Sequence, residues 1–125
     1  MLQSELNQIL DSHELWVEDN KKGKKADLSN QNLSGLDFSE RNLKNIHLSF
    51  SNFSDADFSH ANLAFANLYS VFFSFVNLSN ANLSYVNLSH ANLSRANLSD
   101  ANLSEANLSG ARILNANLSL ARSEE

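Results

Sequence analysis

The chain has 125 residues, a formal net charge of -5 at pH 7 and no cysteine. This length supports one domain with one core, and the absence of cysteine excludes a disulfide framework, a thiolate metal site and a cysteine nucleophile. The acidic balance argues against direct binding of nucleic acid, and no apolar run approaches the ~20 residues that span a bilayer.

Residues 1–25 are predicted to form a capping helix and a linker. Glycine is favoured just after a helix and cations are favoured near its carboxyl end, so Gly23 and the lysines around it suggest a helix stop. Acidic residues directly precede these lysines, so we interpret them as a solvated helix end and not as an anion-binding surface. The predicted apolar face comprises Leu2, Leu6, Ile9, Leu10, Trp16 and Val17.

Residues 26–120 repeat one five-residue phrase without interruption. From Ala81 it reads ANLSY VNLSH ANLSR ANLSD ANLSE ANLSG. Nineteen consecutive repeat centres, five residues apart from position 28 to position 118, are all Leu, Phe or Ile. A small residue usually lies two positions before the centre. Asn or Asp lies between the two in sixteen of the nineteen repeats, the exceptions being His47, Phe72 and Arg112.

A period of five fits neither a helix nor a straight strand. On a helix five residues rotate by ~500°, so the centres would spiral around the surface, and on a strand they would alternate between faces. The pattern buries every centre if the chain turns once in each repeat, and Asn and Ser favour such turns. About four turns of ~90° close one coil of about twenty residues. Coils of this kind stack at the strand spacing of ~4.8 Å.

The repeat resembles the A(D/N)LXX motif of the pentapeptide-repeat protein family over residues 26–120. The resemblance implies an all-β fold, a right-handed quadrilateral parallel β-helix with about four repeats per coil. We expect this solenoid to follow the short N-terminal capping α-helix and to precede a C-terminal tail at residues 121–125. A disordered Asn/Ser-rich tract is the alternative, but such tracts lack strictly periodic Leu and Phe.

Both ends of the stack expose unpaired backbone, which must be covered or guarded. In the first coil larger residues replace the small one, and we expect them to fill the space beneath the helical lid: Gln31, Leu36, Arg41 and Ile46. At the other end Leu118 and Leu120 lie near an open edge. Either the charged residues Arg122, Glu124 and Glu125 guard this edge, or a second subunit covers it.

Two departures from the repeat mark candidate surfaces. Aromatic residues stand at turn or outward positions, where polar residues are the rule, and form a predicted central belt: Phe65, Tyr69, Phe72, Phe75 and Tyr85. Phe50 lies one coil away, and Phe65 is expected to stack on Tyr85. The belt predicts a protein interface; the alternative is local shielding of the ladder by the rings. An acidic stripe is predicted at Asp37, Glu40, Asp57 and Asp100, with His60 and Asn80 between them.

The sequence shows no pattern of a catalytic or metal site. His47 and His90 are expected two coils apart and His60 on the opposite side, so they cannot share a metal ion, and all four histidines, including His13, are interpreted as exposed. Neither a GxSxG nucleophile motif nor a glycine-rich phosphate loop occurs. A filled rod also offers no water-excluding pocket for paired carboxylates. We therefore predict no enzyme activity and no cofactor.

The sequence predicts a non-enzymatic structural or interaction protein that forms a homodimer and has no membrane or direct nucleic-acid partner. The many Asn-Leu-Ser triplets match the glycosylation acceptor pattern, which favours a bacterial, cytoplasmic protein. The quinolone-resistance members of the family imply an alternative, a DNA-mimicking rod that binds gyrase. Seven acidic against four basic residues within the repeats fit that alternative poorly. Ice binding is a third alternative, but threonine is absent from the chain.

Overall fold

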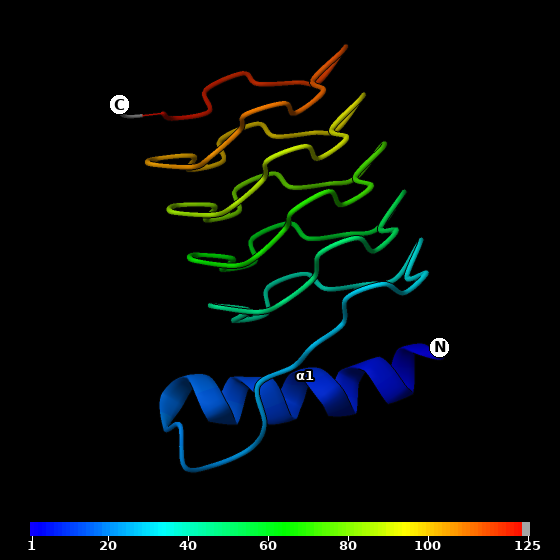
Figure 1. Cartoon of the computed structure of the whole chain (residues 1–125), viewed down its shortest axis with the longest axis vertical. Helices are drawn as coiled ribbons and strands as arrows, with labels where there is room; N and C mark the ends of the chain where they lie inside the picture. Colours follow the sequence, from blue (N-terminus) through cyan, green and yellow to red (C-terminus); the bar gives the residue numbers. More distant parts are fainter. Residues whose placement is uncertain (124–125) are drawn as a thin grey trace.

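The computed structural model describes residues 1–123. It contains one helix, α1 (Gln3–Glu18), and a stack of coils that rises from it toward the C-terminal end (Figure 1). Neighbouring coils are joined by isolated parallel β-bridges between residues 20 apart, from Asp27–His47 to Asn102–Arg122. The bridges recur at every fifth residue, so each coil has four sides. This confirms the predicted stacked-coil solenoid, with single bridging residues in place of longer strands because the chain turns after each one.

The sides and corners of the coil are numbered by position. Side 1 carries the bridging positions 27, 47, 67, 87 and 107, and sides 2, 3 and 4 begin at positions 32, 37 and 42 and recur every 20 residues. The corner that follows each side has the same number. Corner 1 carries positions 30, 50, 70, 90 and 110, and corners 2, 3 and 4 begin at positions 35, 40 and 45.

The turns explain why Asn and Ser recur. The fifth residue of each repeat has a positive φ, for example +59° at Asn80, and Ala81 donates its N–H to the carbonyl of Leu78 at 3.1 Å. Both features are typical of a type II turn. The carboxamide oxygen of Asn77 accepts bonds from the N–H of Ser79 at 3.0 Å and from its hydroxyl at 2.7 Å. The Asn-Leu-Ser triplet therefore closes each corner with its own side chains.

The repeat centres form a continuous core. All centres from Leu28 to Leu103 are at most 5% exposed. The Phe centres stack between coils, as the rings of Phe38 and Phe58 show with a centroid distance of 4.4 Å and an angle of 5°. Each buried Leu or Phe contributes roughly 1.5–3 kcal/mol to stability. The predicted stacking of apolar centres is thus what fills the coil.

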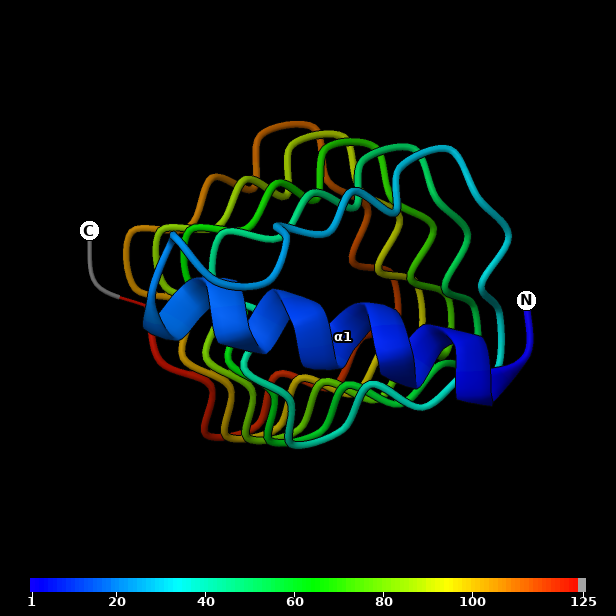
Figure 2. The ribbon, with the colours of Figure 1, turned by 90° about the horizontal axis from the view of Figure 1, so that it is seen from below.

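Helix α1 lies across the open end of the first coil, as Figure 2 shows. Leu6 and Leu10 are fully buried against the coil, and Ile9 is partly buried. The predicted apolar face is wrong at Leu2, whose residue surface is 68% exposed. Trp16 and Val17 are only half-buried.

The helix also ends earlier than predicted, at Glu18 and not near Gly23. Gly23 serves the loop that follows. Its φ is +60°, and a Cβ there would lie 2.1 Å from the carbonyl oxygen of Ser12. The next residue, Lys24, donates its N–H to that same oxygen at 3.2 Å. Glycine is required because the loop passes directly against the helix backbone.

Side chains of α1 take the place of a preceding coil. The Gln3 carboxamide donates to the Asp37 carbonyl at 2.8 Å and accepts the Asp37 N–H at 2.9 Å. Glu14 accepts the N–H of Asn42 at 2.9 Å. One coil higher, the equivalent N–H of Asp57 bonds to the Leu36 carbonyl instead. The helix therefore satisfies backbone groups at the lower edge that would otherwise be free to pair with another chain.

The larger residues of the first coil contact this lid in two ways. Ile46 is fully buried and Leu36 packs partly against the core, as predicted. Arg41 instead forms ion pairs with Asp11 and Glu14 of α1, each at 2.6 Å. The lid is thus held by apolar contacts at its centre and by charge pairing at its rim.

His13 is buried, so the prediction of an exposed histidine is wrong at this position. Its Nδ1 accepts the N–H of Ala26 at 2.9 Å, and its Nε2 donates to the carbonyl of Lys44 at 3.0 Å. This pairing requires a neutral ring with the proton on Nε2. Burial is the main cause that lowers the pKa of His13, and the charge of Lys25 acts in the same direction, against the Lys44 hydrogen bond and Glu14.

The lowered pKa of His13 predicts a loss of stability in mild acid. In the unfolded chain the ring titrates near its ordinary pKa of 6.5, whereas the folded protein keeps it neutral to lower pH. Below about pH 6.5 the unfolded state thus binds more protons, and the free energy of unfolding falls as the pH falls. Urea unfolding of the wild type at pH 7.5 and pH 5.5 measures this change.

The variants His13→Gln and His60→Gln isolate the contribution of the buried ring. His13→Gln should lower stability at pH 7.5 and remove most of the difference between the two pH values. His60→Gln, at an exposed corner, should keep the wild-type difference. Equal pH dependence in the wild type and in His13→Gln would show that the buried ring does not control stability.

Candidate interaction surfaces

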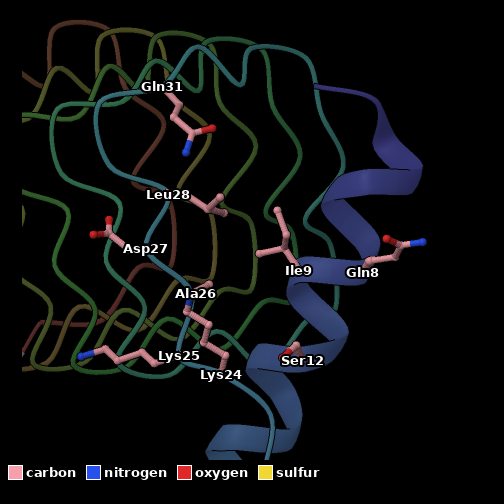
Figure 3. A pocket seen from close by; sticks show the side chains of 9 residues that line it. All are labelled: Gln8, Ile9, Ser12, Lys24, Lys25, Ala26, Asp27, Leu28 and Gln31. Atoms are coloured by element: carbon pink, nitrogen blue, oxygen red, sulfur yellow. The ribbon is translucent and has the colours of Figure 1, made fainter.

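The hollow between α1 and the first coil has a volume of about 400 Å³ (Figure 3). Figure 3 shows Ile9 of α1 pointing toward Leu28 of the coil, with Lys24 and Lys25 nearby. The one carboxylate in its lining, Asp27, accepts the N–H of Ser29 at 3.0 Å and its hydroxyl at 2.6 Å. These two bonds lower the pKa of Asp27 and tie the carboxylate to a turn. The lining therefore holds no second carboxylate with which Asp27 could form a catalytic pair.

The histidines outside the lid lie on separate parts of the coil: His47 on side 1, His90 at corner 1 and His60 at corner 3. Within residues 1–123, three or more His, Cys, Asp or Glu side chains nowhere come together as a metal site would require. The described part of the chain also holds no helix long and apolar enough to cross a membrane.

The structure divides the predicted aromatic belt into two groups. Phe50, Tyr69, Phe72 and Phe75 lie along corner 1, side 2 and corner 2, and we call them the aromatic face. Phe65 and Tyr85 lie at corner 4, on the far side of side 1, and we call them the aromatic pair. Residues 65–75 are close in sequence, but the chain turns twice between them and places them on different sides.

The aromatic rings differ in the contacts that they make with other side chains. Phe65 and Tyr85 stack in parallel at 4.8 Å, as predicted, and the Nζ of Lys44 lies 5.7 Å from the Phe65 ring. Tyr69 is half-buried between Phe50 at 5.4 Å and His90 at 5.6 Å. Phe72 and Phe75 are 53% and 57% exposed, close to the 53% of Phe50, the 52% of Phe65 and the 55% of Tyr85. Of these six rings, Phe72 alone contacts no other aromatic ring or cation within residues 1–123.

The acidic stripe lies where the repeat arithmetic predicts. Asp37 and Asp57 bridge to one another on side 3, and Glu40 and Asp100 share corner 3 with His60 and Asn80 between them. Asp37 accepts the N–H of Ser39 at 2.8 Å, and Asp57 that of Ser59 at 2.9 Å, as Asn does elsewhere. Hydrogen bonds from Ser39 lower the pKa of Asp37. These two carboxylates thus close turns, which leaves Glu40 and Asp100 as the freer charges.

The last described coil exposes apolar side chains and unpaired backbone. Leu118 is 42% exposed and Leu120 78%, whereas the centres below Leu108 are buried. Leu98 donates its N–H to the Asn117 carbonyl at 2.8 Å, but the N–H groups of Ile113 and Leu118 have no partner within residues 1–123. Arg122, predicted to guard this edge, continues the ladder by donating its N–H to Ala101. Glu124 and Glu125, the other two predicted guards, lie outside the described residues.

Solved structures with the same fold include one plant protein and two cyanobacterial proteins. A pentapeptide repeat protein of the Arabidopsis thaliana thylakoid lumen is 30% identical, with 75% of this chain and 66% of that chain covered and a TM-score of 0.73. HetL from the cyanobacterium Nostoc, described as involved in heterocyst differentiation regulation, is 27% identical, with coverages of 78% and 55% and a TM-score of 0.69. Rfr23 from the cyanobacterium Cyanothece is 27% identical, with coverages of 86% and 66% and a TM-score of 0.57.

The chain spans 55–66% of the length of these three structures. Among curated proteins, none matches it. A family model described as pentapeptide repeats matches residues 24–59, 42–80, 73–110 and 87–122, which together cover the whole coil stack. The protein therefore belongs to the pentapeptide-repeat family.

Proposed function

We propose that the protein is a non-enzymatic interaction module with the right-handed coil of its family, and that it associates with a second copy through its last coil. The observation that carries this proposal is the exposure of Leu118 and Leu120 beside unpaired N–H groups, in a stack whose lower coils are buried and paired. Unpaired edges and exposed apolar residues favour contact with another chain. At the opposite end, side chains of α1 already satisfy such groups.

The size of the contact limits its strength. One coil end presents about 400 Å², so two ends bury about 800 Å² in total, below the ~1,600 Å² of a standard interface. Backbone hydrogen bonds between the two last coils would stabilise the dimer in addition to the buried area. A twofold arrangement closes the assembly, because each edge then meets its own symmetry mate. We therefore expect a dimer that forms at micromolar concentrations.

Sedimentation equilibrium at tens of micromolar tests the proposal. The wild type should sediment as a dimer, and Leu118→Glu combined with Leu120→Glu should sediment as a monomer, because association would bury four carboxylates. The matched variant, Phe65→Ser combined with Tyr85→Ser, changes the aromatic pair at corner 4 and should remain a dimer. A monomeric wild type, or a monomer only in the aromatic variant, contradicts association through the last coil.

A cytoplasmic location is part of the same proposal, supported by the Asn-Leu-Ser triplets that a glycosylating pathway would modify along the ladders. The DNA-mimicking alternative has less support. Two of the four carboxylates of its acidic stripe, Asp37 and Asp57, are engaged in turns. Basic residues also lie next to this stripe, with Arg95 at corner 2 and Arg112 on side 2.

A further inference from the structure

A hollow of about 340 Å³ opens on side 2 and corner 1, across the three upper coils. It lies on the flank of the rod and not on the coil end proposed for self-association. Residues of different chemistry from three successive coils line it, among them Ser70, Phe72, His90, Asn92, Gly110 and Arg112. Phe50, Tyr69 and Phe75 of the aromatic face lie beside it on corners 1 and 2.

The repeat itself shows which of these residues the fold does not require. At the bridging position of side 2, Asn52 and Asn92 bond to the serine two residues later, at 3.0 and 3.1 Å. Phe72 and Arg112 occupy the same position in other coils and have no carboxamide with which to make this bond. Two of the three departures from Asn or Asp along the chain thus fall on this one side. Residues that break a local rule without a gain for the fold are candidates for function.

His90 is held in place by its neighbours. A Cβ on Gly110 would lie 2.7 Å from the His90 Nδ1, so the ring rests against the glycine. The Tyr69 ring meets His90 edge to face at 5.6 Å. Ser70, one coil below at the same corner, has a short side chain. The corner therefore presents a fixed imidazole between two small residues, which leaves room for a ligand beside it.

The hollow and its surroundings carry cations and hydrogen-bond donors. Arg112 is exposed within the hollow, and Arg95 lies at corner 2 with its guanidinium 5.6 Å from the Phe75 ring. Neither arginine forms an ion pair within residues 1–123. The Asn92 carboxamide adds a donor, and the acidic stripe lies on side 3 and corner 3, separated from side 2 by corner 2. A guanidinium beside amide and hydroxyl groups suits a carboxylate, which arginine binds in a bidentate manner.

We propose that this hollow binds an acidic peptide segment, with a carboxylate on Arg112 and an adjacent apolar side chain on the exposed ring of Phe72. Arginine and aromatic residues are enriched where proteins bind proteins. Three basic side chains, one of them a histidine, match one or two carboxylates and not a polyanion, and the net charge of -5 disfavours nucleic acid. The complementary charge therefore selects a peptide as the occupant.

Amide NMR shifts of the full chain, titrated with acetyl-glutamyl-phenylalanine amide, test this proposal. We expect saturable shifts confined to the amides around His90, Asn92, Gly110 and Arg112. Arg112→Gln should weaken binding about tenfold, as loss of a charged hydrogen-bond partner does. Arg122→Gln is the matched control, because Arg122 occupies the same repeat position on side 4, and it should leave the affinity unchanged. The glutaminyl analogue of the peptide should bind about tenfold more weakly than the glutamyl peptide.

The other outcomes overturn the proposal. An absence of saturable shifts removes the site, and equal affinity for the glutamyl and glutaminyl peptides removes the role of the carboxylate. Acetate that matches the peptide in affinity would show a simple anion site without a peptide contact. Unchanged binding in Arg112→Gln, with a melting curve like that of the wild type, excludes this arginine as the anchor.

Discussion

Replacing Leu83 with Asp is expected to unfold the coil stack. Leu83 is fully buried, and the repeat places it between Leu63 and Leu103, the centres of side 4 in the coils below and above. An unpaired carboxylate buried there costs several kcal/mol, a large part of the 5–15 kcal/mol that stabilises an ordinary domain. Leu98→Asp, at 1% exposure, should behave in the same way. Circular dichroism and calorimetry should show the loss of the cooperative melt.

The control for this prediction lies on the surface of the same coils. Arg95 is exposed at corner 2, and Arg95→Ala should cost less than about 0.5 kcal/mol. Leu83→Met keeps the volume and the apolar character of the core and should cost less than about 1.5 kcal/mol. A melt close to that of the wild type in Leu83→Asp would refute the filled core.

The sequence was sufficient to predict the coil because one physical constraint acts on every repeat. A centre can be buried at every fifth residue only if the chain turns each time, and the 20-residue bridges show that four turns close the coil. The same arithmetic correctly places Tyr85 one coil above Phe65 and Asp57 one coil above Asp37. The same arithmetic also places positions 65 and 75 two corners apart. The predicted single aromatic belt nevertheless grouped them, because they are close in sequence.

The contacts of the lid could not be predicted in this way. Gln3, His13 and Glu14 pair with backbone groups of residues that follow them by 13 to 34 positions. No repeat relates the helix to the coil, so the sequence pattern does not specify which face of α1 meets which edge. A polar side chain such as His13 therefore appeared suited to solvent, although the unpaired edge of a first coil requires polar partners.

The interaction surfaces could be predicted in part: the sequence indicated some of their residues, but not how these residues lie together. The sequence identified Phe72 and Arg112 as two exceptions to the Asn or Asp of the repeat. Only the structure shows that both residues line one hollow with His90. The orientation of His90 depends on the missing Cβ of Gly110, two residues before Arg112 and one coil above the histidine. Such a contact depends on the coil register and on a side-chain conformation together.

Deletion of residues 1–20 is expected to destabilise the remaining coils strongly. The deletion removes the buried side chains of Leu6 and Leu10 and uncovers Leu28, Leu36 and Ile46 of the first coil. Two buried leucines contribute roughly 4 kcal/mol, which corresponds to a fall in melting temperature on the order of 10–20 °C for a domain of this size. The lower edge also loses the hydrogen bonds from Gln3 and Glu14, so light scattering should detect association of the truncated chain.

Paired substitutions on the intact helix test whether stability depends on its buried contacts with the coil or only on the presence of residues 1–20. Leu6→Ala combined with Leu10→Ala removes buried contacts and should lower the melting temperature nearly as far as the deletion does. Leu2→Ala combined with Leu15→Ala alters leucines that are 68% and 48% exposed and should change it by only a few degrees. If the truncated chain stayed monomeric and melted with the wild type, the first coil would need no cover. The edge bonds of Gln3, His13 and Glu14 would then contribute nothing that water does not supply.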